Sequence, residues 1–413
     1  MRNNTVKVTV RAANAALLAA LVAAVGPALA ADQAPKPPAV SAALQKPLAE
    51  VQELLKANKF PEAIDKLHAA DALAGKTPYD QHTINQMTAY ACSKTNDVPC
   101  VGKALQGQID DGFTTSDENQ KFTRLVAQVN FQNKDYDKAI DYGNRAIKGG
   151  FGNDDMYSVV AGAYYLKEDY KDAAQLESTH IPDLAKKGET PKQEELSLYT
   201  SACAKLKDDD CIRQALQYQV TYYPKPEAWA ELIYAVRPSG DVETLQTYRL
   251  MMDVGAMKNA DDYLDMASVG LGRGSPGDAQ HALKMGADAG AFTGAKAGDA
   301  QKLTAEAKKA AANDQATLPR IEQEANAAPT GAKNAGVGLA YLGYQQFDKA
   351  AEQFAKAVSK GGLKNEADSR LNLGIAQLKA GHKDDAVQTF QSVKGPPVLE
   401  RLAALWVIHA KQS

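Results

Sequence analysis

The residues best placed to do chemistry are four cysteines, which occur as two copies of one arrangement. Cys92 and Cys100 are eight residues apart, as are Cys203 and Cys211, and asparagine or aspartate lies between the members of each pair. An unbroken helix would hold the ends of this spacing about 12 Å apart, whereas a disulfide needs Cα atoms closer than about 7 Å. Each pair can therefore form a disulfide only if a turn separates two helices. A redox or metal site is the alternative, although the pairs lack C-x-x-C spacing and have no histidine nearby in sequence.

Other candidate sites are weaker. Gly272–Gly277 reads GRGSPG and fits G-x-G-x-x-G, but the dinucleotide motif requires a preceding strand, and the pattern before it is helical. We interpret it as a turn between helices. Asp154 and Asp155 follow Asn153 at the start of a predicted helix, where carboxylates satisfy free amides rather than catalyse a reaction. The six histidines are scattered, with no H-E-x-x-H pair. The sequence therefore predicts no catalytic residue, metal site or cofactor, and it does not indicate an enzyme.

A repeated packing pattern organises the chain around these residues. Its best copy is the stretch Gly338–Ala357, GLAYLGYQQFDKAAEQFAKA, which reads as two amphipathic helices joined near Gln345. At the start of the second helix an aromatic residue is followed three positions later by a small residue. The small residue suits the place where two helices cross most closely, and the aromatic residue fills the turn end. The copies are Phe60 with Ala63, Tyr136 with Ala139, Tyr170 with Ala173, Phe347 with Ala350 and, more weakly, Lys383 with Ala386.

This spacing resembles the tetratricopeptide repeat, a helix-turn-helix unit of about 34 residues. The resemblance implies an all-α fold, a right-handed α-solenoid of about ten helical hairpins in which each repeat contacts only its neighbours. A last helix, Val398–Lys411, would cap the exposed end. Hairpins five to eight match poorly, and residues 285–335 hold few large apolar side chains. The hairpins are expected to begin near residues 45, 79, 115, 153, 191, 225, 259, 297, 331 and 365.

The cysteine pairs share one place in this repeat. They are offset by 111 residues, three periods of 37, so each pair flanks the turn between the two helices of its hairpin. Antiparallel helices would bring the two cysteines face to face. We therefore predict the disulfides Cys92–Cys100 and Cys203–Cys211.

The N-terminus predicts export. Residues 1–30 read as a signal peptide: Arg2, Lys7 and Arg11 precede an apolar run, and Ala28–Ala30 fits the A-x-A cleavage form, with the cut after Ala30. A membrane anchor is the alternative, but the run is short for a bilayer of about 30 Å. No later segment has 18 uninterrupted apolar residues, so we expect no membrane segment in the mature chain. Removing three positive charges changes the net charge from −3 to −6, which argues against nucleic acid as a partner.

The expected organisation has four parts. The signal peptide is followed by a proline-rich linker over residues 31–44, a first repeat array over 45–295, and further repeats with the capping helix over 296–413. With the export signal, the resemblance indicates a periplasmic or secreted protein of the exported bacterial type.

The resemblance also implies a function. In such arrays the first helix of each hairpin lines a concave groove that binds proteins or peptides. We therefore predict a non-catalytic scaffold of the bacterial cell envelope whose partners are other envelope or secreted proteins or peptides. Ordinary packing between repeats is the alternative for each groove residue. A glycan or cell-wall binding module is the alternative function, with the pairs Tyr164–Tyr165 and Tyr222–Tyr223 as aromatic platforms. The candidate partner-binding residues are Lys121, Arg124, Gln128, Phe131, Tyr165, Leu339 and Leu342.

Overall fold

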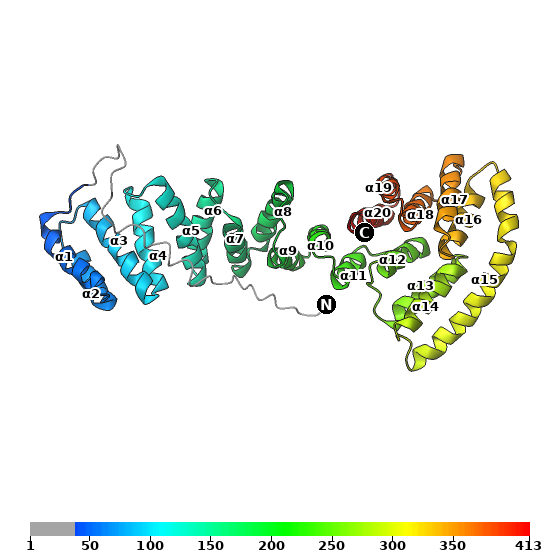
Figure 1. The fold of residues 1–413 in the computed structure, drawn as a ribbon, viewed down its shortest axis with the longest axis horizontal. Coiled ribbons are helices and arrows are strands. Elements are labelled where there is room, and N and C mark those ends of the chain that lie inside the picture. Colours follow the sequence, from blue (N-terminus) through cyan, green and yellow to red (C-terminus); the bar gives the residue numbers. More distant parts are fainter. Residues whose placement is uncertain (1–37) are drawn as a thin grey trace. The chain divides into compact units, whose positions relative to one another are not determined.

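The computed structural model describes residues 38–413, and within them all regular secondary structure is helical (Figure 1). The predicted signal peptide and residues 31–37 of the predicted linker lie outside the described residues. The chain forms two compact units, the first ending at Asp208 and the second spanning Asp209–Ser413. The first unit contains α1 (Ala42–Lys56), α2 (Phe60–Asp71), α3 (Pro78–Thr95), α4 (Val98–Asp111), α5 (Ser116–Gln132), α6 (Tyr136–Lys148), α7 (Asp154–Leu166), α8 (Tyr170–Lys187) and α9 (Gln193–Leu206). The second contains α10 (Asp209–Tyr222), α11 (Pro226–Tyr234), α12 (Asp241–Asp253), α13 (Ala260–Gly272), α14 (Pro276–Asp288), α15 (Ala295–Ala327), α16 (Ala332–Gly343), α17 (Phe347–Lys360), α18 (Glu366–Lys379), α19 (Lys383–Gln391) and α20 (Pro397–Gln412).

The helix starts follow the predicted repeat. The largest difference is at the first hairpin, where α1 begins at Ala42 instead of residue 45. Residues 42–44 thus belong to a helix and not to the predicted linker, because Leu44, Leu48 and Val51 form its buried face. The GRGSPG segment joins α13 to α14, as predicted for a turn.

A residue with left-handed backbone closes each connection between a first and a second helix. At Lys134 and Glu168 this conformation lets the next amide donate to a carbonyl of the preceding helix: Asp135 N to Asn130 O and Asp169 N to Tyr164 O, both at 2.9 Å. These bonds satisfy carbonyls that a helix end leaves free. The nine residues are Asn58, Asn96, Lys134, Glu168, Lys207, Arg237, Gly274, Gln345 and Gly381.

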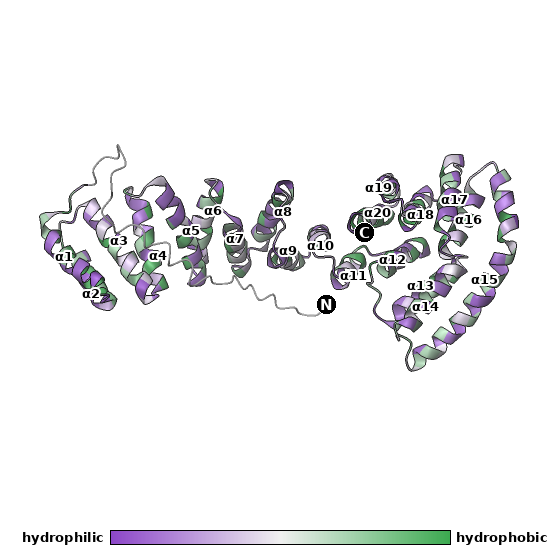
Figure 2. Cartoon of the chain, viewed as in Figure 1, coloured by the Kyte–Doolittle hydropathy of each residue, from purple (hydrophilic) through white to green (hydrophobic). Residues whose placement is uncertain are grey.

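The small residues lie at the helix crossings as predicted. A Cβ at Gly338 of α16 would lie 3.0 Å from the Phe354 ring of α17, so glycine lets the two helices approach closely at this crossing without displacing the ring. Each helix carries both hydrophobic and hydrophilic residues (Figure 2), which lets one side pack while another faces water. The alanines Ala63, Ala139, Ala173, Ala350 and Ala386 are fully buried, with 0% of their surface exposed.

The eighth predicted hairpin is instead one helix, α15, of 33 residues. No residue within it has left-handed backbone, so nothing reverses the chain, and the helix extends for about 50 Å. It buries a narrow line of mostly small side chains: Ala300, Ala307, Ala311, Leu318 and Ala325. Polar bonds strengthen this modest contact. The hydroxyls of Tyr341 and Tyr344 donate to Glu322 at 2.6 Å and Asp314 at 2.7 Å, while Lys360 donates to the Ala325 carbonyl near the C-terminus of α15.

The second unit departs from an array in which each repeat contacts only its neighbours. Helix α20 packs against α18 and α19 and also against α10 and α12, so the end of the chain meets the start of the unit. Trp406 of α20 is 1% exposed and stacks on Phe390 with ring centroids 5.8 Å apart. Helix α20 therefore closes the second unit instead of capping an exposed end. The compact units divide at Asp208 and not near residue 295, because α15 packs against α13, α14 and α16.

Candidate partner-binding surface

The first helices of the hairpins form one layer of the first unit. Besides packing on its own second helix, α1 packs against α3, α5 against α7, and α7 against α9. The helices of this unit follow one another in a row (Figure 1), and packing joins neighbouring hairpins. Lys121 and Gln128 both lie on α5. We call the side of α5 that carries them, together with the same side of α3, α7 and α9, the first-helix face.

On α5, two predicted residues have unused polar groups. Lys121 is exposed and makes no ion pair or hydrogen bond with any described residue. Gln128 is half-buried, and its Oε1 atom accepts no hydrogen bond within the described chain. The two residues are seven positions apart, two helical turns, so they lie on one side of α5. This face therefore offers an exposed cation that the unit itself does not use, beside a half-buried glutamine whose buried Oε1 atom has no hydrogen-bond partner.

The other two predicted residues of α5 take part in packing. Arg124 donates through Nη1 to the Phe151 carbonyl, at 3.0 Å, and so joins α5 to the segment before α7. Phe131 lies against Tyr136 with ring centroids 5.8 Å apart, where α5 turns into α6. Both interactions position the face and leave these groups less available to a partner.

Tyr165 of α7 also belongs to a hairpin turn. Its ring meets the Tyr170 ring edge to face at 5.2 Å, and its neighbour Tyr164 accepts a hydrogen bond from Asn144 Nδ2 at 3.2 Å. Tyr164, Tyr165 and the pair Tyr222–Tyr223 are all half-buried. The described structure thus shows no fully exposed aromatic platform at these positions.

Leu339 and Leu342 of α16 lie in the core of the second unit. Leu342 is 6% exposed, and Leu339 is partly buried against the same hydrophobic cluster. The resemblance placed both on a groove because it assumed an open array. Helix α16 packs against α14, α15, α17 and α18, and Leu342 is a core residue and not a surface contact.

A buried polar network, unexpected from the sequence, joins α12 to α14 and α18. Arg249 Nε donates to Asp278 Oδ1 at 3.2 Å, Nη2 of Arg249 donates to Asp278 Oδ2, and Nη1 donates to Asn372 Oδ1. Gln246 donates to both Asp368 and Asn372, at 2.7 and 2.8 Å. Arg249 and Asp278 are each 5% exposed. These bonds connect residues up to 126 positions apart, so no local sequence pattern could have revealed them.

A second polar cluster gathers where α12, α18 and α20 meet. Asp253 accepts from His409 Nε2 at 2.8 Å and from Lys379. Burial opposes ionisation of Asp253, but the hydrogen bonds from His409 and Lys379 hold its pKa below the ordinary value of 3.8. On α14, burial lowers the pKa of His281, whose Nδ1 lies 2.7 Å from Gln345 Nε2. The cluster around Asp253 joins α12, α18 and α20, and it contains no nucleophile paired with a base.

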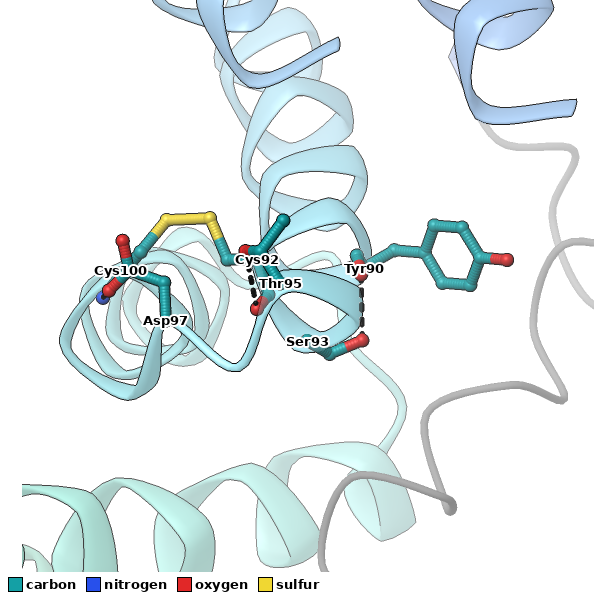
Figure 3. The surroundings of a disulfide bond; sticks show 6 residues. All are labelled: Tyr90, Cys92, Ser93, Thr95, Asp97 and Cys100. Carbon is teal, nitrogen blue, oxygen red and sulfur yellow. Dashed lines mark hydrogen bonds between the residues drawn. A yellow bond between two sulfur atoms is a disulfide. The ribbon is translucent and has the colours of Figure 1, made fainter. Parts of the chain in front are cut away.

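The disulfide prediction is confirmed. Cys92 near the end of α3 and Cys100 in α4 are bonded, with Cα atoms 5.9 Å apart (Figure 3). The left-handed residue Asn96 reverses the chain between them. Cys203 and Cys211 are also disulfide-bonded, and no cysteine is free.

In residues 38–413, no group of three or more histidine, cysteine, aspartate or glutamate side chains is arranged to hold a metal ion. Among the twenty described helices, none combines the length and apolar character needed to cross a membrane.

The chain is only weakly similar to known proteins. No protein-family model and no curated protein matches the sequence. A solved structure of Naa15/Naa10 bound to HypK-THB is 14% identical with a TM-score of 0.26, over 85% of this chain and 64% of that chain. The crystal structure of the APC/C hetero-tetramer Cut9–Hcn1 is 13% identical with a TM-score of 0.23, over 80% of this chain and 69% of that chain. This chain thus spans less than two thirds of the first of these proteins.

TM-scores this low carry no argument about the present chain. The tetratricopeptide-like character of the hairpins rests instead on their left-handed turn residues and on the buried alanines at their crossings.

Proposed function

We propose that the chain is a non-catalytic scaffold that binds a segment of another protein on the first-helix face of the first unit. The observation that carries the proposal is Lys121, which is exposed on α5 and whose ammonium has no partner among the described residues. On the same side of α5, Gln128 is half-buried and its Oε1 atom lacks a hydrogen-bond partner. A polar group without a partner costs free energy, which a partner's N–H would offset if the glutamine side chain turned outward to meet it.

The chemistry of the face limits what it binds. Lys121 fits a carboxylate of the partner, and Gln128 Oε1 fits an N–H group two helical turns along α5. We therefore propose an extended protein or peptide segment that carries an acidic group as the partner.

We further propose that the protein is an exported member of the tetratricopeptide repeat family and acts in a bacterial cell envelope. Two disulfides support an oxidising compartment, because such bonds are rare in a reducing cytosol. The N-terminal signal pattern points the same way. Envelope or secreted proteins are the corresponding partners.

Site-specific photocrosslinking in cells of the source organism tests the proposal. A photoreactive phenylalanine analogue is placed at Lys121, at Gln128 and, as a control, at Lys103, an exposed residue of the second helix α4. We expect one protein to be captured from positions 121 and 128 and not from 103. Capture of the same proteins from all three positions, or from none, would contradict the proposal.

A further inference from the structure

Helix α8 carries an unusual buried pair of titratable residues. Glu177 is 0% exposed, and both of its carboxyl oxygens lack a hydrogen-bond partner. One turn later, His180 is 4% exposed, and its Nε2 atom also lacks one. In the described residues, six buried side-chain nitrogen or oxygen atoms lack a hydrogen-bond partner, and three of them belong to one side of α8. Ordinary packing does not explain why glutamate and histidine occupy these buried positions.

The neighbouring helices supply no cation to Glu177. On α7, the Tyr157 ring stacks on the His180 ring at 3.7 Å, and Asp154 Oδ1 lies 3.9 Å from His180 Nε2. On α9, Glu195 accepts the Ser158 hydroxyl at 2.6 Å and the Lys192 backbone amide at 3.0 Å. The Lys192 ammonium is directed to Asp155, at 2.8 Å, and Lys186 of α8 is directed to Asp183, also at 2.8 Å. Lys187 is exposed at the end of α8.

The packing therefore favours neutral forms. Burial, with a smaller contribution from Glu195, raises the pKa of Glu177 well above the ordinary value of 4.5. Burial also raises the pKa of Glu195 and lowers that of His180. Ionising Glu177 in place would put a second carboxylate charge into a buried region without a counter-ion, which is strongly unfavourable.

We propose that the packing of α8 against α7 and α9 depends on a proton held by Glu177. While Glu177 is protonated, α8 stays packed; when the proton leaves to solvent, α8 moves so that the carboxylate reaches water. Because α7 and α9 contribute to the first-helix face, this contact makes that part of the first unit sensitive to external pH. The inference goes beyond the proposed function and holds whether or not that face binds a partner.

Hydrogen exchange of the full-length protein between pH 5 and 9 tests this inference. The open form releases a proton that the packed form retains. The opening equilibrium of α8 should therefore rise tenfold per pH unit between 6.5, the ordinary pKa of histidine above which His180 is neutral in both forms, and the raised pKa of Glu177. After correction for intrinsic exchange, protection of the α8 amides should fall by that factor over part of the range. Amides of α6 serve as an internal reference.

Three variants complete the test. Glu189→Gln changes an exposed glutamate just beyond α8 and should keep the wild-type slope. Glu177→Gln removes the titrating group at nearly constant shape, and Glu177→Met also removes the unpaired oxygens; each should lose the tenfold dependence. The proposal is overturned if the wild type shows no such slope, or if both Glu177 variants keep it.

Discussion

The Arg249 network predicts a large and selective loss of stability in the second unit. Arg249→Met removes the partner of Asp278, which is 5% exposed and would retain the Ser275 hydroxyl at 2.6 Å. Breaking a buried ion pair from one side typically costs about 3–5 kcal/mol, because the remaining charge is uncompensated. Removing both charges with Arg249→Met and Asp278→Leu should cost much less than the sum of the single changes.

Urea unfolding followed by tryptophan fluorescence measures this loss. Both tryptophans, Trp229 and Trp406, lie in the second unit, so the signal reports on that unit. With a urea dependence of about 2–3 kcal/mol per molar, Arg249→Met should lower the midpoint by about 1–2.5 M. Arg320→Met is the control: this arginine of α15 is 66% exposed in its pair with Glu324, and losing it should cost less than about 1 kcal/mol. A midpoint unchanged by Arg249→Met, or additive costs in the double variant, would refute the reasoning.

Three further predictions concern crossings, disulfides and pH. Gly277→Ala should destabilise the second unit by about 1–3 kcal/mol, because its Cβ would lie 2.5 Å from the Gly343 carbonyl carbon; Gly336→Ala, which meets nothing within 4 Å, should not. Replacing Cys92 and Cys100 with serine should cost roughly 2–3 kcal/mol, seen in the circular dichroism transition of the first unit but not in tryptophan fluorescence. Asp253→Asn should destabilise the second unit at neutral pH, where the carboxylate is ionised. The difference from wild type should shrink as pH falls below 3.8, because the lowered pKa of Asp253 gives stability only above that range.

Local signals explain why so much of the fold could be predicted. Thr77 and Thr115 each form a capping box at the start of a first helix, and Asn153 also caps through its side chain. Turn residues such as Asn96, and fully buried alanines such as Ala350, recur at fixed positions. Each of these features is encoded within a few residues, so the sequence pattern alone locates the helices and the Cys92–Cys100 bond.

The features that could not be predicted depend on distant residues. Within helix α15 no residue adopts left-handed backbone, although Asn313 and Asp314 repeat the dipeptide that forms the turn at Asn96 and Asp97. The local sequence therefore did not reveal that the chain continues here without a turn. Closure of the second unit rests on pairs such as Gln246 with Asp368, 122 positions apart. Leu342 was expected on a groove but lies in the core, because α16 is packed against α14, α15, α17 and α18. On α5, the repeat pattern could not show that Arg124 is already hydrogen-bonded to the Phe151 carbonyl.

The central claim, that the first-helix face binds a partner protein, is tested most directly by calorimetry with the protein captured by crosslinking. The full chain and single variants are titrated with that protein. Lys121→Glu and Gln128→Leu should each weaken binding about tenfold or more, as for residues at the centre of an interface. Lys103→Glu, which makes the same charge reversal on α4, should leave the affinity within about twofold, since rim and distant charges contribute little. Equal losses for Lys121→Glu and Lys103→Glu, or no loss for either α5 variant, would contradict the account.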